Sequence, residues 1–220
     1  MGEVQDKKRI CIVDDHPVFR KGLAQLIDEE ADLVVVGEAE GVREAILLIG
    51  RRAPDLVIVD ISLKDSSGID LIEYISENFP GLPVLVISMH DEGLYAQRVL
   101  RAGALGYTTK QEMTDNVVKA VRQVMDGKRY VSEAMMDALL GQMVSGGNQA
   151  PLEPVKTLSN RELEVFQLIG QGYKRREIAD LLYLSVKTIG TYRESIKKKL
   201  NLKTANELMR YAVTFTQGKT

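Results

Sequence analysis

The stretch ICIVDD, residues 10–15, decides the fold, because a short aliphatic run leads directly into two aspartates. In three later stretches a similar run leads into a single polar residue, namely DLVIVD at 55–60, PVLVIS at 83–88 and ALGYTTK at 104–110. These runs are apolar on both faces and rich in Val and Ile, which is typical of strands in a parallel sheet covered by helices. We therefore predict that each stretch is a buried parallel strand with a polar residue at its downstream end.

Strand and helix patterns alternate through the first half of the chain. The predicted strands are ICIV (10–13), LVVVGEA (33–39), LVIVD (56–60), PVLVISM (83–89) and LGYTTK (105–110). Helical spacing follows each of them, at 17–29, 42–52, 68–79, 93–103 and 114–127. Five such units with right-handed crossovers predict an α/β fold, a flavodoxin-like doubly wound five-stranded parallel sheet of order 2-1-3-4-5.

Five polar residues, Asp14, Asp15, Asp60, Ser88 and Lys110, stand at the downstream ends of these strands. In open α/β sheets, ligands gather just beyond the carboxyl ends of the strands, so these side chains should converge in space. Carboxylates held together raise one another's pKa unless a cation joins them, and Mg²⁺ binds one or two carboxylates together with water and phosphate. The set therefore predicts a site for Mg²⁺ and a phosphoryl group.

Asp60 is the natural phosphoryl acceptor, because it ends the middle strand and an aspartate can form an acyl phosphate. Asp14 and Asp15 would hold the ion, and Ser88 and Lys110 would bond the phosphoryl oxygens. The metal and the lysine would neutralise the oxygens of the transferring group. The alternative is that Asp60 caps a strand end and Lys110 is a solvated surface residue.

Two other residues near the first strand are expected to have no chemical role. The single cysteine, Cys11, cannot form an internal disulfide, which fits a reducing cytoplasm, and its place in a strand favours a buried, inert thiol,. His16 is expected to face solvent at a helix start, because a hard oxygen site does not need imidazole.

Charge divides the chain into two parts. From Pro151 onward there are 13 Lys and Arg against 7 Asp and Glu, whereas the preceding residues have 16 against 24. An acidic part joined to a basic part implies two partners of different character. The stretch VSGGNQAPLEPVKT, residues 144–157, is rich in Gly, Pro and small polar residues and reads as a linker. We find no apolar run near the ~20 residues of a membrane span and no signal peptide, so no membrane partner is expected.

The basic part is short and helical, with helices expected at 160–170, 174–182, 186–200 and 204–216. Ser159 with Glu162 and Thr204 with Glu207 form capping-box patterns, and Ser185 is a good N-cap,. Two helices joined by a tight turn, the second one basic, are typical of a helix-turn-helix. We therefore predict an all-α four-helix domain that binds DNA.

The third of these helices has two faces. Val186, Ile189, Tyr192, Ile196 and Leu200 form one apolar stripe that should pack on the other helices. The opposite face should approach base edges through Lys187, Thr191 and Glu194. Other residues are expected to contact DNA around it, most of them gripping phosphates: Lys174, Arg175, Arg176, Thr188, Arg193, Lys197 and Lys198. A merely solvated charged face is the alternative.

Residues 7–127 resemble the receiver domain of a two-component response regulator, through DD at 14–15, VDISL around Asp60, VISM at 86–89 and GYTTK at 106–110. The resemblance implies that the backbone carbonyl of Ser62 is a further metal ligand. It also implies that Tyr107 turns inward as Ser88 meets the phosphate. Ser62 and Lys64 depart from the family, which often has methionine and proline there, and could alter the lifetime of the phosphoryl group.

Residues 158–203 resemble the LuxR-type helix-turn-helix domain, through LSNRELEV, EIADLL, SVKTI and KKKLNLK. The whole chain is thus similar to NarL/FixJ-class response regulators, with a receiver at 7–127, a connecting helix and linker at 128–156 and the DNA-binding domain at 157–220. Within the connection, VSEAMMDALLGQMV at 131–144 is expected to be helical. Gly190 stands where a base-contacting side chain is common, and Glu194 where a basic one is common, so the target sequence does not follow.

The resemblance implies a cytoplasmic transcription factor that is no enzyme, with a histidine kinase and double-stranded DNA as partners. The kinase would phosphorylate Asp60, and the final helix, 204–216, would join two copies on DNA. One rival is a constitutive DNA-binding protein whose receiver serves only dimerisation or sensing. Another is a phosphatase, which usually needs a second acid two residues beyond its nucleophile, where this chain has Ser62.

Overall fold

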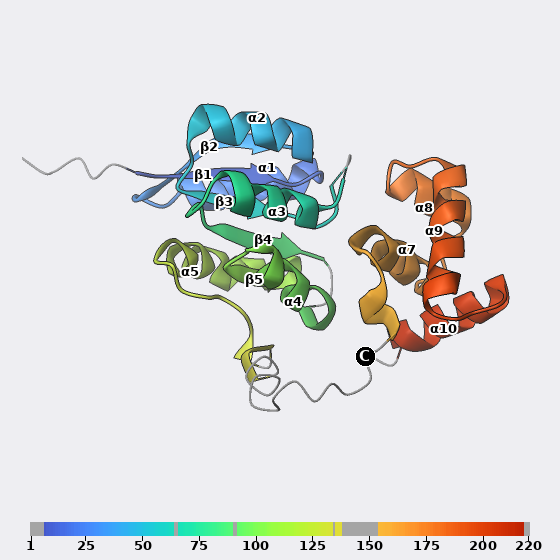
Figure 1. The fold of residues 1–220 in the computed structure, drawn as a ribbon. Coiled ribbons are helices and arrows are strands. Elements are labelled where there is room, and N and C mark those ends of the chain that lie inside the picture. The colour runs from blue at the N-terminus through green and yellow to red at the C-terminus, as the bar shows by residue number, and fades with distance from the viewer. Residues whose placement is uncertain (1–6, 64–65, 90–91, 134, 138–153, 218–220) are drawn as a thin grey trace, which may run out of the picture. The chain divides into compact units, whose positions relative to one another are not determined.

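The computed structural model contains one parallel sheet with strand order β2-β1-β3-β4-β5 (Figure 1). Its strands are β1 (Lys8–Val13), β2 (Leu33–Ala39), β3 (Leu56–Val59), β4 (Val84–Ser88) and β5 (Gly106–Thr109). The predicted order is therefore confirmed, and so is the doubly wound α/β class. The structure describes residues 7–63, 66–89, 92–133, 135–137 and 154–217.

Helices cover both faces of this sheet. They are α1 (Pro17–Asp28), α2 (Val42–Arg52), α3 (Gly68–Asn78), α4 (Glu92–Ala102) and, after the short 3-10 turn η1 (Lys110–Glu112), α5 (Met113–Met125). Apolar residues of α1 and α5, such as Leu23 and Val121, form one core with Ile10, Ile58 and Leu85 of the strands. On the other face α2, α3 and α4 pack side by side in that order. Every strand interior is thus covered, which explains its unbroken apolar runs.

The register of the strands brings their carboxyl ends to one edge. Val13 pairs with Val59, Val59 pairs with Val86, and Ser88 pairs with Thr109. The residues that follow these pairs therefore leave the sheet next to one another, as expected from the strand ends.

By contacts, the chain divides into two compact units, residues 1–146 and 147–220. The described part of the second unit is helical: η2 (Pro154–Thr157), α7 (Asn160–Gly170), α8 (Arg175–Leu181), α9 (Val186–Lys199) and α10 (Ala205–Gln217). The end of the predicted linker is therefore ordered as η2, where Val155 is only 2% exposed. Phe166 of α7 contacts two rings of α10, with centroids 5.9 Å from Tyr211 and 5.5 Å from Phe215.

The predicted helix caps are present. Ser159 and Glu162 form a reciprocal capping box, and the Ser185 hydroxyl accepts from the Thr188 amide at 3.0 Å. Thr204 accepts from the Glu207 amide at 3.1 Å, and the Glu207 carboxylate accepts from the amide of Lys203 at 2.8 Å. These caps satisfy amides at the helix starts that have no partner within their helices.

One residue of the apolar stripe on α9 was wrongly placed. Ile189 and Ile196 are fully buried and Leu200 is 8% exposed, whereas Val186 is 41% exposed. At about 100° per residue, Val186 and Tyr192 lie some 60° to either side of the stripe's centre, so both are edge positions. Tyr192 is half-buried, but Val186 also begins the helix and has fewer neighbours to cover it.

The connecting segment at 131–144 lies largely outside the described residues. Within it, Glu133 and 135–137 have helical backbone, and Met135 is 9% exposed. The amide of Met136 donates to the carbonyl of Ser132 at 3.0 Å, as in a first helical turn. The rest of the predicted connecting helix stays a prediction.

Candidate phosphoacceptor site and nucleic-acid interface

Asp14, Asp15, Asp60 and Lys110 meet at the carboxyl edge of the sheet. Asp14 and Asp15 follow β1, Asp60 follows β3 and Lys110 follows β5. The Lys110 ammonium lies 2.6 Å from an oxygen of Asp14 and 2.7 Å from Oδ2 of Asp60. Its side chain is only 4% exposed, so the reading of Lys110 as a solvated surface residue is wrong.

His16 lies above the same carboxylates, which the sequence did not indicate. Its side chain is 61% exposed, in keeping with a helix start, but Nδ1 lies 2.7 Å from Oδ1 of Asp15. The same nitrogen is 3.4 Å from Asp14 and 3.9 Å from Asp60. The imidazole therefore lies between the acidic cluster and solvent. His16 faces solvent as expected, but its Nδ1 points toward the carboxylates.

Burial raises the pKa of the Asp14 carboxyl above its ordinary value, and the charge of Asp60 raises it further against the pull of Lys110. Burial likewise raises the pKa of Asp15, while the nearby His16 opposes this. Each carboxylate is thus costly to keep ionised in this position, because water is excluded and like charges are close. A bound cation would remove both costs.

The cluster fits a divalent cation. Ligand atoms of Asp14, Asp15, His16 and Asp60 all lie within 4.8 Å of one another. Oδ1 of Asp60 is buried and accepts no hydrogen bond from the described residues, while the contact of Asp15 Oδ1 is with the partly exposed His16 ring. Buried carboxylate oxygens without partners are rare in folded proteins, and such oxygens are the ligands that Mg²⁺ prefers.

The loop after Asp60 is held close to the start of α3. A Cβ atom at Gly68 would lie 1.9 Å from the backbone oxygen of Asp60, so no larger residue fits without moving the acceptor loop. The Gly68 amide also donates to Ile61 at 2.6 Å, and Ser62 forms an isolated antiparallel bridge with Ser67. The predicted metal ligand Ser62 thus lies in a constrained loop. Lys64, the other departure from the receiver pattern, lies outside the described residues.

Ser88 and Tyr107 lie inside the molecule beside these strand ends. Ser88, the last residue of β4, is fully buried, and Tyr107 of β5 is 1% exposed. The Tyr107 amide donates to the carbonyl of Tyr130 at 2.7 Å. Phe19 of α1 adds a contact that the sequence did not suggest, because the Lys110 ammonium stands 4.3 Å from its ring centroid,.

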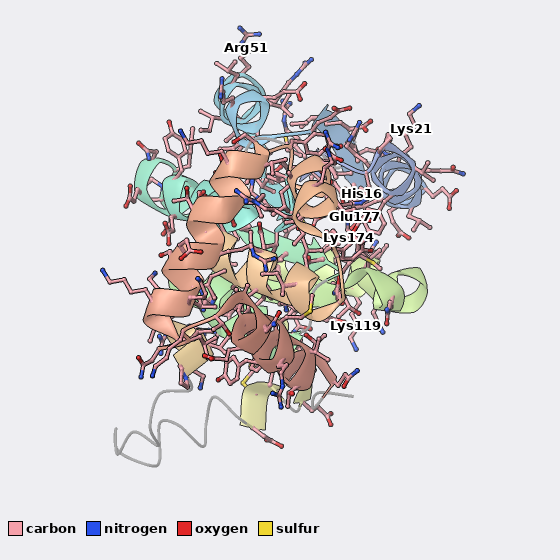
Figure 2. The ribbon with its side chains drawn as sticks, turned by 90° about the vertical axis from the view of Figure 1, so that its right-hand side faces the viewer. His16, Lys21, Arg51, Lys119, Lys174 and Glu177 are labelled. Carbon is pink, nitrogen blue, oxygen red and sulfur yellow. The ribbon has the colours of Figure 1, made fainter. Side chains whose placement is uncertain are left out.

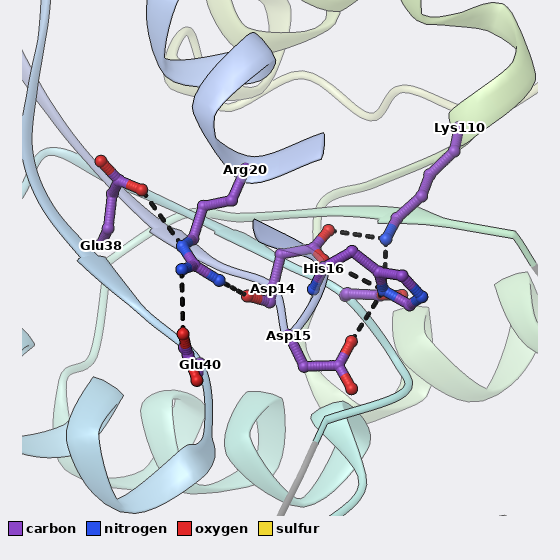
Figure 3. Close-up of polar contacts among 8 residues, drawn as sticks. Asp14, Asp15, His16, Arg20, Glu38, Glu40 and Lys110 are labelled. Atoms are coloured by element: carbon purple, nitrogen blue, oxygen red, sulfur yellow. Dashed lines mark hydrogen bonds and ion pairs between the residues drawn. The ribbon is translucent and has the colours of Figure 1, made fainter. Parts of the chain in front are cut away.

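A second buried cation, Arg20 of α1, contacts the loop that carries Asp14 (Figure 3). Its guanidinium donates to the backbone oxygen of Asp14 at 2.5 Å, to Glu38 at 3.1 Å and to Glu40 at 3.1 Å. These three contacts tie the loop between β1 and α1 to the end of β2, and Arg20 itself is only 8% exposed. An arginine in an amphipathic helix gives no sequence signal for this contact.

Most candidate DNA-contacting residues lie on the surface of α8 and α9. Lys174, Arg175, Arg176, Lys187, Thr191, Glu194 and Lys198 are exposed, while Thr188, Arg193 and Lys197 are half-buried. Figure 2 shows Lys174 and Glu177 beside each other at the start of α8, where the Lys174 amide donates to Glu177 at 2.6 Å. The predicted set thus gathers on two helices joined by one turn.

Two lysines of α9 are already paired with glutamates. Lys197 lies 2.9 Å from Glu194, and its side chain is only 17% exposed. Lys199 lies 2.6 Å from buried Glu162 of α7, which also accepts from Ser195 at 2.6 Å. The end of α9 is therefore fastened to α7, while its beginning remains open on one face.

Comparisons with known proteins agree with both units. Residues 10–122 match the family described as response regulator receiver domain, and residues 156–212 match bacterial regulatory proteins, luxR family. The chain is 36% identical to the oxygen regulatory protein NreC of Staphylococcus carnosus over 209 residues, covering 93% of this chain and 96% of that protein. A similar protein in Staphylococcus epidermidis is also 36% identical, over 210 residues.

Solved structures of the response regulator RcsB are similar as well. RcsB of Salmonella enterica serovar Typhimurium, bound to promoter rprA in the presence of phosphomimetic BeF3-, aligns with a TM-score of 0.61 at 28% identity. That alignment covers 94% of this chain and 99% of RcsB. A structure of two RcsB dimers bound to two parallel DNAs aligns with a TM-score of 0.57 at 27% identity, covering 95% and 99%.

Among the described helices, none is long and apolar enough to cross a membrane. A family match over more than half of the chain and relatives aligned along nearly all of it agree with the fold and with the residues gathered at the sheet edge. The chain therefore belongs to the NarL/FixJ class of response regulators, and it is a phosphorylation-controlled regulator of transcription with a LuxR-type DNA-binding domain.

Proposed function

We propose that Asp60 is the phosphoryl acceptor and that a partner histidine kinase is the donor. The observation that carries this is the Asp60 carboxylate, with Oδ2 bonded to Lys110 at 2.7 Å and Oδ1 buried without a hydrogen bond from any described residue. One carboxylate oxygen would attack phosphorus, forming an O–P bond as the P–N bond to the donor imidazole breaks. The donor nitrogen takes up a proton, and Lys110 and Ser88 hold the phosphoryl oxygens.

Asp15, Asp60 and the backbone carbonyl of Ser62 would hold Mg²⁺, with Asp14 behind them. When bound, the ion would neutralise charge on the transferring group. Asp14 is less available than Asp15, because one of its oxygens bonds Lys110 and the other accepts from the His16 amide at 2.8 Å. We infer no chemistry beyond this self-phosphorylation and its hydrolysis, so the protein is not assigned an enzyme activity.

Asp15→Asn should weaken Mg²⁺ binding by more than Asp14→Asn does. Loss of an outer-shell partner typically costs roughly 10- to 100-fold in metal affinity, and loss of a direct ligand should exceed this. Calorimetric titration of Mg²⁺ into each variant measures the difference. Asp126→Asn, an exposed aspartate paired with Lys128 at 3.2 Å, is the control and should bind Mg²⁺ like the unaltered protein. Equal losses in both site variants would make the acid pair structural.

For the second unit we propose that α9 enters the major groove, with α8 and its flanking cations on the phosphates. We also propose that the protein is cytoplasmic. Its receiver would span residues 7–127, its connecting segment 128–156 and its DNA-binding domain 157–220. We place the dimer contact on α10, where Met209 is 45% exposed. The RcsB structures on promoter DNA and as dimers on DNA support the arrangement.

Phosphorylation should strengthen DNA binding by the full chain, and residues 147–220 alone should bind without it. A modification shifts an equilibrium only by its differential affinity for two states, and such couplings amount to about 1–3 kcal/mol, or roughly 5- to 150-fold. Fluorescence anisotropy with a duplex selected from a random pool measures all three forms. If the fragment and both forms of the full chain bind alike, the receiver does not regulate and the constitutive rival is favoured.

Thr191→Ala should relax preference at one or two base pairs, by about 1–3 kcal/mol for a true base contact. Arg176→Ala should instead weaken binding to every sequence and lower the slope of log K against log salt by about 1. Salt titrations on the selected duplex and on a scrambled one separate the two effects. Glu194→Ala is expected to act like Thr191→Ala, but it also releases Lys197 from its ion pair. Unchanged preference in both α9 variants would show that their face does not read DNA.

A further inference from the structure

Arg175 of α8 lies across α9 at the position of Gly190. A Cβ atom built on Gly190 would lie 2.0 Å from Nη2 of Arg175 and 2.8 Å from Cζ. The guanidinium of Arg175 therefore fills the volume that any side chain at position 190 would need. An interior glycine weakens a helix relative to alanine, and here the guanidinium of Arg175 occupies the space that the missing side chain leaves.

The guanidinium is also held in place along α9. Its Nε donates to the carbonyl of Val186, the first residue of α9, at 2.8 Å. With Nε engaged, the two terminal nitrogens remain as a parallel pair of donors. Arg175 is exposed and forms no ion pair with the described residues, so nothing in this part of the chain neutralises it.

Gly190 is half-buried and borders the exposed face of α9. At about 100° per residue it lies roughly 60° from Lys187 and 40° from Glu194 around the helix axis. The guanidinium of Arg175 thus stands beside the residues of α9 that face away from α7. Burial and then the positive charge of Arg175 lower the pKa of Arg193, so the two guanidinium groups repel each other and an electron-rich partner from outside would offset that repulsion.

We propose that Arg175, seated across Gly190, is a sequence-reading residue of this protein and that it recognises guanine in the major groove. A guanidinium donates two parallel hydrogen bonds to O6 and N7 of guanine, and the pair of terminal nitrogens left free by the Val186 contact suits this geometry. The residues at the beginning of a recognition helix are those that meet base edges, and Arg175 is fastened there. This inference rests on the placement of α9 in the groove proposed above, and it replaces the expected phosphate contact of Arg175.

The test compares phosphorylated full-length variants on a duplex selected from a random pool and on its single base-pair substitutions. Arg175→Ala should lose discrimination at one or two G·C pairs by about 10- to 100-fold. Arg175→Lys keeps the charge but not the paired donors, so it should lose the same discrimination while retaining most of the salt dependence. Arg176→Ala, an exposed neighbour on α8, is the matched control and should weaken all duplexes alike.

Gly190→Ala tests the seat itself, because it leaves Arg175 in the chain and fills the space that it occupies. This variant should weaken the preference for the same G·C pairs. Combining it with Arg175→Ala should cause no further loss of that preference. Thermal unfolding monitors the fold, which the added methyl group should not weaken once the side chain of Arg175 has been removed.

Three outcomes would overturn the proposal. Arg175→Ala could weaken binding to every duplex equally, Arg175→Lys could retain the full preference for G·C pairs, or Gly190→Ala could discriminate between duplexes like the unaltered protein. Lys187→Ala and Thr191→Ala separate this from a failure of the proposed function. If these two variants also leave preference unchanged, α9 does not read DNA, whereas a loss confined to them would reject only the role of Arg175.

Discussion

Asp60→Asn should abolish formation of the phosphoprotein. Among the described residues, Asp60 combines a place at the middle strand end with a bond to Lys110, at 2.7 Å, and a second carboxylate oxygen that is buried and accepts no hydrogen bond from them. An amide in its place is a poor nucleophile and cannot form an acyl phosphate. After incubation with acetyl phosphate and Mg²⁺, intact-mass measurement should show one added phosphoryl group on the unaltered protein and none on the variant.

Asp126→Asn should gain the phosphoryl group normally, because this exposed aspartate lies beyond α5 and pairs only with Lys128 among the contacts described. The adduct of the unaltered protein should also be cleaved by hydroxylamine, as expected of an acyl phosphate. A full adduct on Asp60→Asn would show that another residue is the acceptor. The DNA affinity of Asp60→Asn should likewise no longer respond to acetyl phosphate.

Glu162→Ala should destabilise the DNA-binding unit by on the order of 3 kcal/mol. Glu162 is 4% exposed, and its carboxylate accepts from the Ser159 amide, the Ser195 hydroxyl and the Lys199 ammonium, each at 2.6 Å. The variant loses the capping box of α7 and leaves donors from α9 without their partner. Urea denaturation of residues 147–220 measures the free energy of unfolding.

Glu194→Ala is the matched control, because its ion pair with Lys197 is formed by a carboxylate that is 73% exposed. Exposed pairs contribute little, so this variant should stay within about 0.5 kcal/mol of the unaltered unit. Similar losses in the two variants would mean that the Glu162 cluster does not fasten α9 to α7.

Acid should remove the contribution of Glu162. Burial raises the pKa of Glu162, but the bonds from Lys199, Ser195 and Ser159 outweigh it and leave this pKa below its ordinary value of 4.5. The carboxylate therefore stabilises the folded unit fully above that ordinary value, and its contribution disappears as pH falls through the lower folded value. The difference in free energy of unfolding between the unaltered unit and Glu162→Gln should therefore become smaller as pH falls below 4.5. A difference that does not change with pH would contradict this assignment.

The strands and the acidic edge were predictable because both follow from local patterns and from topology. A buried parallel strand must be apolar on both faces, so ICIV and LVIV could be recognised as strands from the sequence. The helix α2 was predicted with the bounds observed. Parallel strands also present their carboxyl ends at one edge. Asp14, Asp60 and Lys110 therefore had to meet there, although up to 96 residues separate them in the chain.

Contacts between different elements depended on the tertiary structure. The crossing of Arg20 to Glu38 requires the distance between α1 and β2, and the ring of His16 over the acid pair requires the turn of the loop between β1 and α1. No periodicity encodes either of them. The exposure of Val186 follows from which neighbours reach the first turn of α9. The sequence alone determined the strand order, the acidic edge and the helix-turn-helix pattern. Only the tertiary structure decided that Arg175 lies over Gly190, because the direction of a long side chain depends on what the neighbouring helix leaves open,.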